Sequence, residues 1–444
     1  MGRTDLALGF WLLAILPGIC AAAPDRDPST LTLNEAVVLG LERNVDIVLA
    51  EQNLAQMNSR YREIVGMGLP ELSASGVYTR NYKEPLAFTN GTKMRMGDLN
   101  GMTATVDVEQ ILYAGGSVRA GRQAALAGVA ATTESLRAAQ DETVFAVKRL
   151  FWRIVLASAT VSIQQDTVAS AEDHLQTTRT RFKEGLESDL AVLRQEVEVA
   201  GTKPLLIRAR NLLEVGLTRL KNTLKMDVDH PLSISGDLSF PTDPLPPYER
   251  LVQCAMDHDA TLQAARRRAL SAQHNVDVVR GYARPSLSLF GRYQWQAQSP
   301  DFSPTVDEKG ESLAAGLRAY APLYMGGSNL ERIRQAEIEY QKSVELVDQA
   351  ERNVRVALKT DYLDAQEARE RAESQNTAIA QARRALTAME MRYGAGQASQ
   401  LDLNDATLSL QRARLAHVLA LSDYWTGVAA VEKTTGQHFK EIVP

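Results

Sequence analysis

The sequence predicts an α+β membrane protein, built by internal duplication, in which long helices continue into β-hairpins. Three observations support this fold class. Short motifs recur in the same order in both halves of the chain, two long stretches contain no proline, and segments between the helical stretches alternate apolar and polar residues. The absence of proline permits very long helices, and a period of two with one apolar face is typical of a strand.

The duplication rests on residues that recur at a nearly constant offset. The motif Tyr113-Ala-Gly-Gly-Ser117 recurs as Tyr324-Met-Gly-Gly-Ser328, a shift of 211 residues. An Arg-aromatic-x-x-Gly-x-x-Ser motif recurs at the same shift, at 181–188 and 392–399. A third set, between Gly66 and Tyr78, recurs at a shift of 215 residues, so the two shifts differ by 4. A length change confined to one place indicates a tolerant loop between Tyr78 and Tyr113.

The amino terminus predicts export through a signal peptide at residues 1–22. Arg3 precedes an apolar run from Leu6 to Ile19, and small residues follow at the expected cleavage site. The run is too short to span a bilayer as a helix. Lipidation of Cys20 is a minority interpretation, because Ile19 occupies the position where the cleavage motif of lipoproteins has Gly, Ala or Ser. If Cys20 is removed, only Cys254 remains and no intrachain disulfide is possible.

The elements of the two repeats are expected in the same order. The first repeat covers 32–226 and the second 248–436, with a proline-rich connector at 227–247 and a tail at 437–444. Each repeat begins with a helix that ends at a glycine, Gly66 or Gly281. A β-hairpin, a long helix and a third helix follow, at 70–113, 117–184 and 188–226, and again at 285–324, 328–393 and 399–435. The long helix is about 100 Å, which equals roughly the two shorter helices laid end to end.

The four predicted strands carry an apolar face and a polar face. Leu72, Ala74 and Gly76 alternate with Ser73, Ser75 and Val77, for example. An apolar outer face with a polar inner face is the pattern of an outer-membrane barrel. Four strands are too few to close one, and open edges cannot face lipid, so several chains are expected to share the barrel. If the apolar face meets lipid, the lumen is lined by Asp107, Glu109, Arg292 and Arg318. The alternative is a solvated strand face on a soluble helical protein.

Composition and motifs exclude several function classes. The net charge is −5 and the basic residues form no cluster, so we expect no nucleic-acid partner. The six histidines are scattered, which predicts no metal site and no metal cofactor. Motifs of the common enzyme and nucleotide-binding families are absent, so we expect no enzyme and no cofactor. The Gly-Gly pairs at 115–116 and 326–327 suggest a phosphate-binding loop. They lack the lysine that such a loop uses to bind phosphate, so we expect plain backbone turns.

Over nearly all of its mature length the chain resembles the TolC-like outer-membrane efflux channel family, also called outer membrane factors. The resemblance is carried by Leu31–Val37, by the paired motifs above and by Leu401–Thr407. It implies a homotrimer, with a 12-strand β-barrel in the outer membrane continuous with a 12-helix α-helical barrel across the periplasm. It also implies two partners, a periplasmic adaptor protein and an inner-membrane transporter.

The turns at 183–188 and 394–399 are expected at the periplasmic end of that tunnel, where the family meets its adaptor. The docking candidates are Arg181, Gly185, Ser188, Arg392, Gly396 and Ser399. The alternative is structural, because Gly supplies a left-handed helix cap and Ser begins the next helix. Both interpretations can hold together, since a rigid turn presents a rigid surface.

Asp402, Asp405 and Tyr393 are expected at a pore constriction. The two carboxylates lie one turn apart on one helix face, and the resemblance places such a pair at the tunnel axis, where three chains would supply six carboxylates. Like charges raise one another's pKa values and favour cations. For Asp402 a capping box with Ser399 is an equally strong alternative. Tyr393 matches an aromatic that takes part in the family's closing bonds.

These expectations together predict a passive exit duct of a tripartite efflux or type I secretion system in the outer membrane of a Gram-negative cell, reaching into the periplasm. A different class of function stays open, namely an exported coiled-coil structural or adhesive protein whose hairpins decorate long helices. The sequence does not discriminate between drugs, metal ions and secreted polypeptides as cargo.

Overall fold

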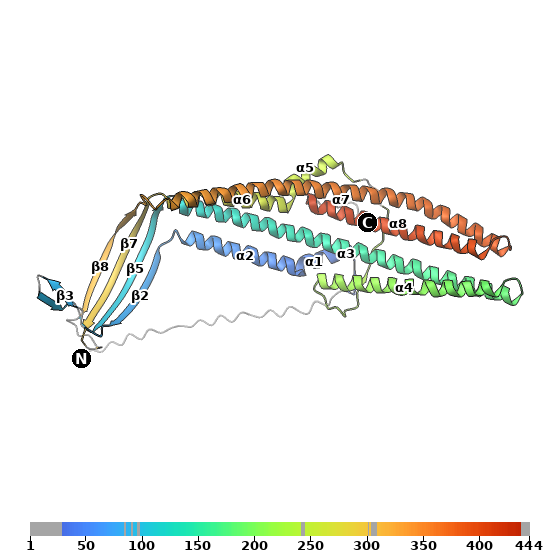
Figure 1. Ribbon diagram of the computed structural model, residues 1–444, viewed down its shortest axis with the longest axis horizontal. Coiled ribbons are helices and arrows are strands. Elements are labelled where there is room, and N and C mark those ends of the chain that lie inside the picture. Colours follow the sequence, from blue (N-terminus) through green and yellow to red (C-terminus); the bar gives the residue numbers. More distant parts are fainter. Residues whose placement is uncertain are drawn as a thin grey trace.

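The computed structural model describes residues 29–83, 86–89, 92–95, 98–240, 245–300, 302 and 309–436. The expected signal peptide at 1–22 and tail at 437–444 lie outside these residues, as do Asn90 and Gly91 in the expected loop of the first hairpin. The described chain is a long rod of helices that ends in a curved sheet (Figure 1).

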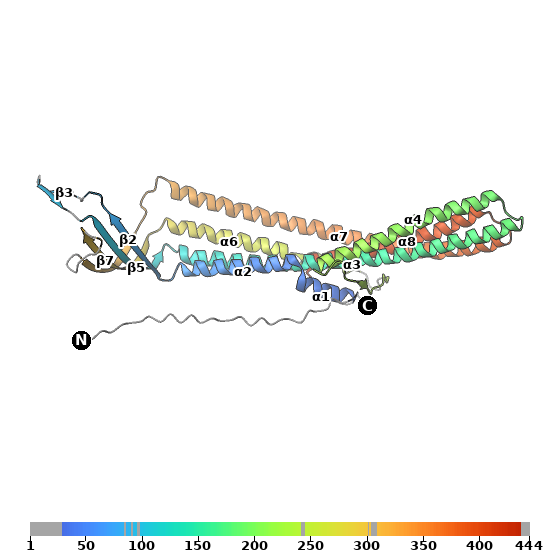
Figure 2. The ribbon, with the colours of Figure 1, turned by 90° about the horizontal axis from the view of Figure 1, so that it is seen from below.

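Two helices run along the rod and the others lie beside them (Figures 1 and 2). The long helices α3 and α7 have 67 residues each, which corresponds to about 100 Å. Helices α2 and α4 both pack on α3, and α6 and α8 both pack on α7. The bounds are α1 Leu33–Arg43, α2 Val45–Gly66, α3 Ser117–Lys183, α4 Asp189–Thr223, α5 Tyr248–His258, α6 Ala260–Tyr282, α7 Ser328–Gly394 and α8 Gln400–Thr435.

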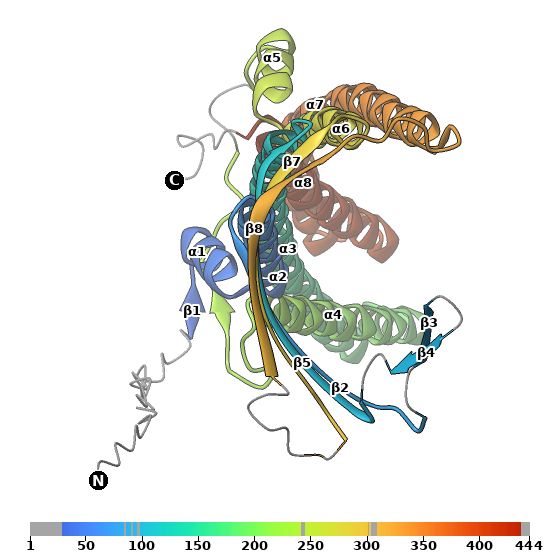
Figure 3. The same cartoon turned by 90° about the vertical axis from the view of Figure 1, so that its left-hand side faces the viewer.

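The first helix of each half is broken, where the sequence predicts one continuous helix. Asn44 ends α1 and caps α2, because its side chain accepts a hydrogen bond from the Asp46 amide at 2.7 Å. Asp259 does the same between α5 and α6, accepting from the Leu262 amide at 2.7 Å. Short polar side chains offer the backbone this alternative to an uninterrupted helix. The breaks let α1 and α5 turn away from the rod, as Figure 3 shows.

Four of the strands form one antiparallel sheet, in the order β2-β5-β7-β8. Their bounds are β2 Glu71–Arg80, β5 Asn100–Ala114, β7 Ser286–Ser299 and β8 Lys309–Tyr320. Within the described chain, β2 and β8 are each paired along one side only, so the sheet is open and contains no closed barrel. The tolerant loop expected between Tyr78 and Tyr113 contains a short hairpin, in which β3 (Leu86–Thr89) pairs with β4 (Thr92–Arg95). Short runs on both sides of an Asn-Gly pair are a strong hairpin signal.

The main apolar core lies midway along the rod, where α1 packs on α3. A two-residue strand pair lies beside it, β1 (Thr30–Leu31) with β6 (Ser233–Ile234) in the connector. The rings of Trp152 and Trp425 stack in this core with centroids 5.5 Å apart. The Trp425 indole N–H donates to the Ser239 carbonyl at 3.1 Å. Burial of large aromatics therefore joins α3, α8 and the connector at one level of the rod.

Across the described part of the chain, no helix combines the length and the apolarity needed to cross a bilayer.

Candidate functional site

The two turns at the helical end of the rod have the same backbone structure. In the first, the Leu186 amide donates to the Arg181 carbonyl and the Gly185 amide to the Phe182 carbonyl. This pair of bonds is a Schellman motif, which needs a left-handed residue, and Gly185 has a φ of +77°. The bonds recur in the second turn, where Gln397 donates to Arg392 and Gly396 to Tyr393. Gly396 has a φ of +72°, so both glycines close the long helices.

Ser188 and Ser399 begin the helices that follow. The Ser188 hydroxyl accepts a hydrogen bond from the Ala191 amide at 3.2 Å. Ser399 and Asp402 form a reciprocal capping box, in which the Asp402 carboxylate accepts from the Ser399 amide at 3.0 Å and from its hydroxyl at 2.7 Å. The structural interpretation of these serines and glycines is therefore correct, and it leaves their surfaces exposed.

Contacts of Tyr393 join the two turns. The Arg181 guanidinium donates to the Tyr393 carbonyl at 3.0 Å and lies over the Tyr393 ring, 4.9 Å from its centroid. The Tyr393 hydroxyl donates to the Glu187 carboxylate at 3.3 Å. Tyr393 is 7% exposed, and this burial raises the pKa of its hydroxyl. An arginine and an aromatic 212 positions apart in the sequence therefore act as one clasp between α3 and α7.

Asp402 and Asp405 differ in their surroundings although both are exposed. Hydrogen bonds from the Ser399 hydroxyl and amide lower the pKa of the Asp402 carboxyl. The Asp405 carboxylate takes no part in that capping box, and its backbone carbonyl accepts from the Ser409 hydroxyl at 2.7 Å. Arg392 lies near the same turn and also favours the charged form of Asp402. The structure thus brings Tyr393, Asp402 and Asp405 to one end of the rod.

Sequence reasoning missed a polar seam above these turns, between the α3/α4 pair and α8. The Gln195 amide nitrogen donates to the Asn404 side-chain oxygen at 3.1 Å, and Gln195 is fully buried. Gln411 donates to Gln164 at 3.0 Å. His174 lines a small cavity beside Gln195, and burial lowers the pKa of its imidazole. Isolated glutamines in long helices look solvated in the sequence, so no local signal marks this seam.

The four residues predicted to line a barrel lumen share one face of the sheet. Asp107 is directly opposite Arg292 in the β5–β7 register, and their side chains form an ion pair at 2.5 Å. Glu109 and Arg318 approach to 3.6 Å across β7. Because side chains alternate between faces along a strand, the pairings of Glu109 with Phe290 and of Arg318 with Ser288 place all four together.

The opposite face of the sheet is apolar. Val106 pairs with Tyr293, and Tyr293 pairs with Leu313, so these three side chains form a row across β5, β7 and β8. A second row joins Leu72 to Val108. Leu313 is 82% exposed and Leu72 is 72% exposed. The sheet therefore presents an uncovered apolar face behind a charged one, which is the two-sided character of a strand set between lipid and water.

No cluster of three or more His, Cys, Asp or Glu side chains with a geometry suited to a metal ion occurs among the residues that the structure describes. At the helical end, Asp402 serves as a cap and Arg181 forms the clasp with Tyr393.

Comparison with known proteins places these features in a family. A protein-family model described as outer membrane efflux protein matches residues 37–224 and 251–437. The outer membrane protein TolC of Vibrio cholerae is 24% identical over 302 residues, 67% of this chain and 68% of that one. The outer membrane efflux protein BepC of Brucella suis is 22% identical over 338 residues, 76% and 72% of the two chains. The crystal structure of the outer membrane protein VceC from Vibrio cholerae is similar with a TM-score of 0.79 at 20% identity, covering 92% of this chain and 96% of that one.

Proposed function

The chain belongs to the outer membrane efflux protein family, and from this premise we propose that it is the passive exit duct of a tripartite efflux or type I secretion system. It is a protein of the outer membrane that reaches into the periplasm. Its fold is that of the TolC-like channels. The single observation that carries the proposal is the two-faced open sheet at the end of a helical rod.

The assembly follows from the sheet. Strands β2 and β8 leave a backbone edge unpaired on each side of the described sheet, and an unpaired edge is not tolerated in lipid. Copies of the chain that pair β2 of one with β8 of the next would remove both edges. Three copies would give twelve strands, the number that the family resemblance implies. The apolar face would then meet lipid and the charged face would line the lumen.

The helical end would be the entrance. Both turns lie at the same end of the rod, far from the sheet (Figure 1), and their caps hold Gly185, Ser188, Gly396 and Ser399 rigid at the surface. We assign adaptor docking to this surface, together with Arg181 and Arg392. Asp402, Asp405 and Tyr393 would narrow the entrance and favour cations there. No enzymatic step is assigned to the chain, so the energy for transport comes from the inner-membrane partner.

Ion conductance tests the duct directly. Purified protein reconstituted in planar bilayers is expected to conduct ions. In fractionated cells, the protein is expected in the outer-membrane fraction as a homotrimer. Folded trimers that pass no ions would favour the structural or adhesive role instead. For docking, Glu184→Cys and Ala395→Cys in a Cys254→Ser background are expected to crosslink to a periplasmic adaptor. A cysteine at exposed Glu345, in the half of α7 nearer the sheet, should not.

A further inference from the structure

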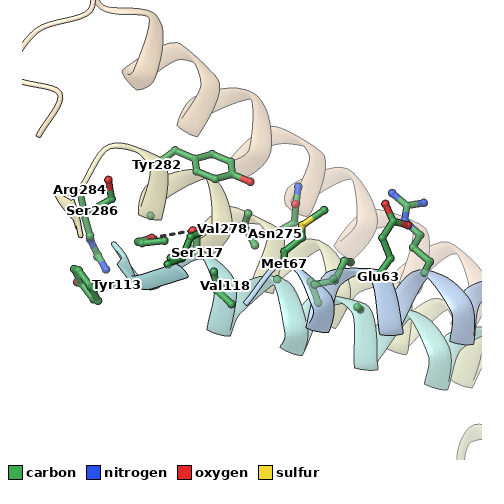
Figure 4. A pocket seen from close by; sticks show the side chains of 18 of the residues that line it. Glu63, Met67, Tyr113, Ser117, Val118, Asn275, Val278, Tyr282, Arg284 and Ser286 are labelled. Carbon is green, nitrogen blue, oxygen red and sulfur yellow. Dashed lines mark hydrogen bonds between the residues drawn. The ribbon is translucent and has the colours of Figure 1, made fainter. Parts of the chain in front are cut away.

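The wall of the rod contains a large cavity at the junction of helices and sheet. Its volume is about 960 Å³, at the upper end of the range of about 300–1,000 Å³ typical of small-molecule sites. Helices α2, α3 and α6 form its walls, and the ends of β5, β7 and β8 close it at the top. Figure 4 shows side chains from these elements turned toward one another around the space, with Tyr282 and Asn275 on α6 and Val118 on α3.

The floor of the cavity consists of small residues on one face of α3. Gly121, Ala124 and Gly128 recur at helical spacing and all line it. A Cβ atom added at Gly121 would lie 3.6 Å from Ile64 Cγ2, and one at Gly128 would lie 3.6 Å from the Met57 sulfur. Both are ordinary van der Waals distances, so packing alone does not require glycine here. The two glycines keep space open that larger residues could occupy.

The rim of the cavity is apolar and exposed. Tyr113, Tyr282, Tyr320 and Met67 are between 52% and 61% exposed and all four line the space. Large exposed apolar side chains gathered around a concave surface are typical of ligand-binding grooves. Methionine adapts its shape to different partners and favours contact with aromatic rings. Arg60 and Glu63 add one charge of each sign on α2.

The cavity opens on the polar side of the sheet. Most of the strand residues that line it lie on this side, among them Glu109, Ile111 and Ser288, whereas Tyr113 and Leu287, which pair with each other, lie on the other side. Ser288 pairs with Arg318 in the β7–β8 register, so these residues belong to the same face as the ion pairs of Glu109 and Asp107. In the duct proposed above, that face is the water-filled side. The cavity would therefore be a niche in the wall of the conduit, open to whatever passes through it.

We propose that this niche binds planar aromatic amphiphiles of drug size during their passage. The proposal rests on the proposed duct function, because it needs the polar face of the sheet to be lumenal. Tyrosine rings stack on a planar ring system, the Met57 and Met67 thioethers fit around it, and Arg60 and Glu63 offer partners to a polar group of either sign. The niche retains such molecules in the wall while small hydrated ions pass.

Filling the floor tests the niche. Gly121→Leu and Gly128→Leu place a side chain in the cavity and stay within a helix that leucine favours. The matched control is Gly201→Leu on α4, where a Cβ meets nothing within 4 Å and no wall of the cavity is touched. The probe is rhodamine 6G, and the readout is the fluorescence anisotropy of the dye titrated with purified full-length trimer in amphipol. The wild type and Gly201→Leu are expected to bind saturably, and the two filled variants about tenfold more weakly.

Equal binding by all four proteins, or dye uptake that does not saturate, would overturn the niche, since the dye would then be held elsewhere or partition without a site. Planar-bilayer conductance of the same preparations separates this result from a failure of the duct. Conductance with no difference in dye binding removes the niche and leaves the duct. Saturable dye binding that the filled variants weaken, without conductance, removes the duct function and with it the role in passage.

Discussion

The Arg181 guanidinium donates to the Tyr393 carbonyl at 3.0 Å and covers the Tyr393 ring, so one side chain of α3 fastens the end of α7. Both turns owe their shape to their own glycine and serine. Their relative position depends on this clasp and on the polar seam above it. We therefore expect the helical end to be held by a few separable polar contacts rather than by a continuous apolar core.

Replacing Arg181 by Ala should loosen the entrance. The variant loses a charge-assisted hydrogen bond and a cation–π contact, each worth about 1 kcal/mol. We expect a several-fold higher conductance in planar bilayers with little change in thermal stability. Arg179→Ala is the matched control, because Arg179 pairs with Glu196 between α3 and α4 only. A conductance that rises equally in both variants would contradict a specific role of the clasp.

Single substitutions should show that the two aspartates have different roles. Asp405→Ala is expected to lower cation preference in reversal-potential measurements while the turn stays folded. Asp402→Ala removes the capping box and should speed amide hydrogen exchange at residues 400–403. The double variant should also lose block by multivalent cations. Unchanged selectivity in every variant would leave capping as the only supported role of the pair.

The Asp402 cap should weaken in acid. Hydrogen bonds from Ser399 lower the pKa of the Asp402 carboxyl, so its contribution to stability is fully present above the unfolded value of about 3.9. It is lost as the pH falls through the lower pKa of the folded state. Hydrogen exchange at 400–403 should therefore accelerate, relative to the intrinsic rate, only below pH about 4. Acceleration near neutral pH would argue against the carboxylate as the cap.

The two faces of the sheet should respond differently to the same new charge. Leu313→Arg places a cation on the apolar face, which costs up to about 2–4 kcal/mol at mid-bilayer. We expect less trimer in outer-membrane fractions by unheated gel electrophoresis. Ser312→Arg, one residue away on the polar face and opposite Gln294, should assemble normally. The reverse result would mean that the polar face, not the apolar one, meets lipid.

The close approach of α7 and α8 at Gly427 should not tolerate a side chain. A Cβ there would lie 2.9 Å from the Ala365 Cβ and 3.1 Å from its Cα, which forces a backbone shift. Gly427→Ala should destabilise the protein by about 1–3 kcal/mol in denaturant unfolding. Gly201→Ala, in open space on α4, should instead be neutral or stabilising by up to about 1 kcal/mol.

Much of this fold could be predicted from local rules. A long span without proline predicted α3 and α7, and Gly185 and Gly396 predicted their ends, because only a left-handed residue closes a Schellman motif cheaply. Alternation predicted the four strands, and with it the shared face of Asp107 and Arg292. These features depend on neighbours a few residues away, which a single sequence contains.

Other features depend on tertiary structure. Asn44 and Asp259 look like solvated positions within helices, and only the packing of α1 and α5 off the rod makes them caps. The Gln195–Asn404 contact joins residues 209 apart, and neither side chain is unusual in its own helix. The cavity over Gly121 forms only where α2, α3 and α6 pack together. The trimer stays a prediction because one chain contains only one copy of the sheet, and the internal duplication stays a prediction as well.

The free edges of β2 and β8 also impose a condition on biogenesis. Strand β2 presents 10 residues and β8 presents 12, each a template onto which any extended peptide can add. In the trimer proposed above, each chain would keep both strand edges unpaired until it meets the other two copies. We therefore expect assembly to depend on covering these two edges before other extended peptides pair with them.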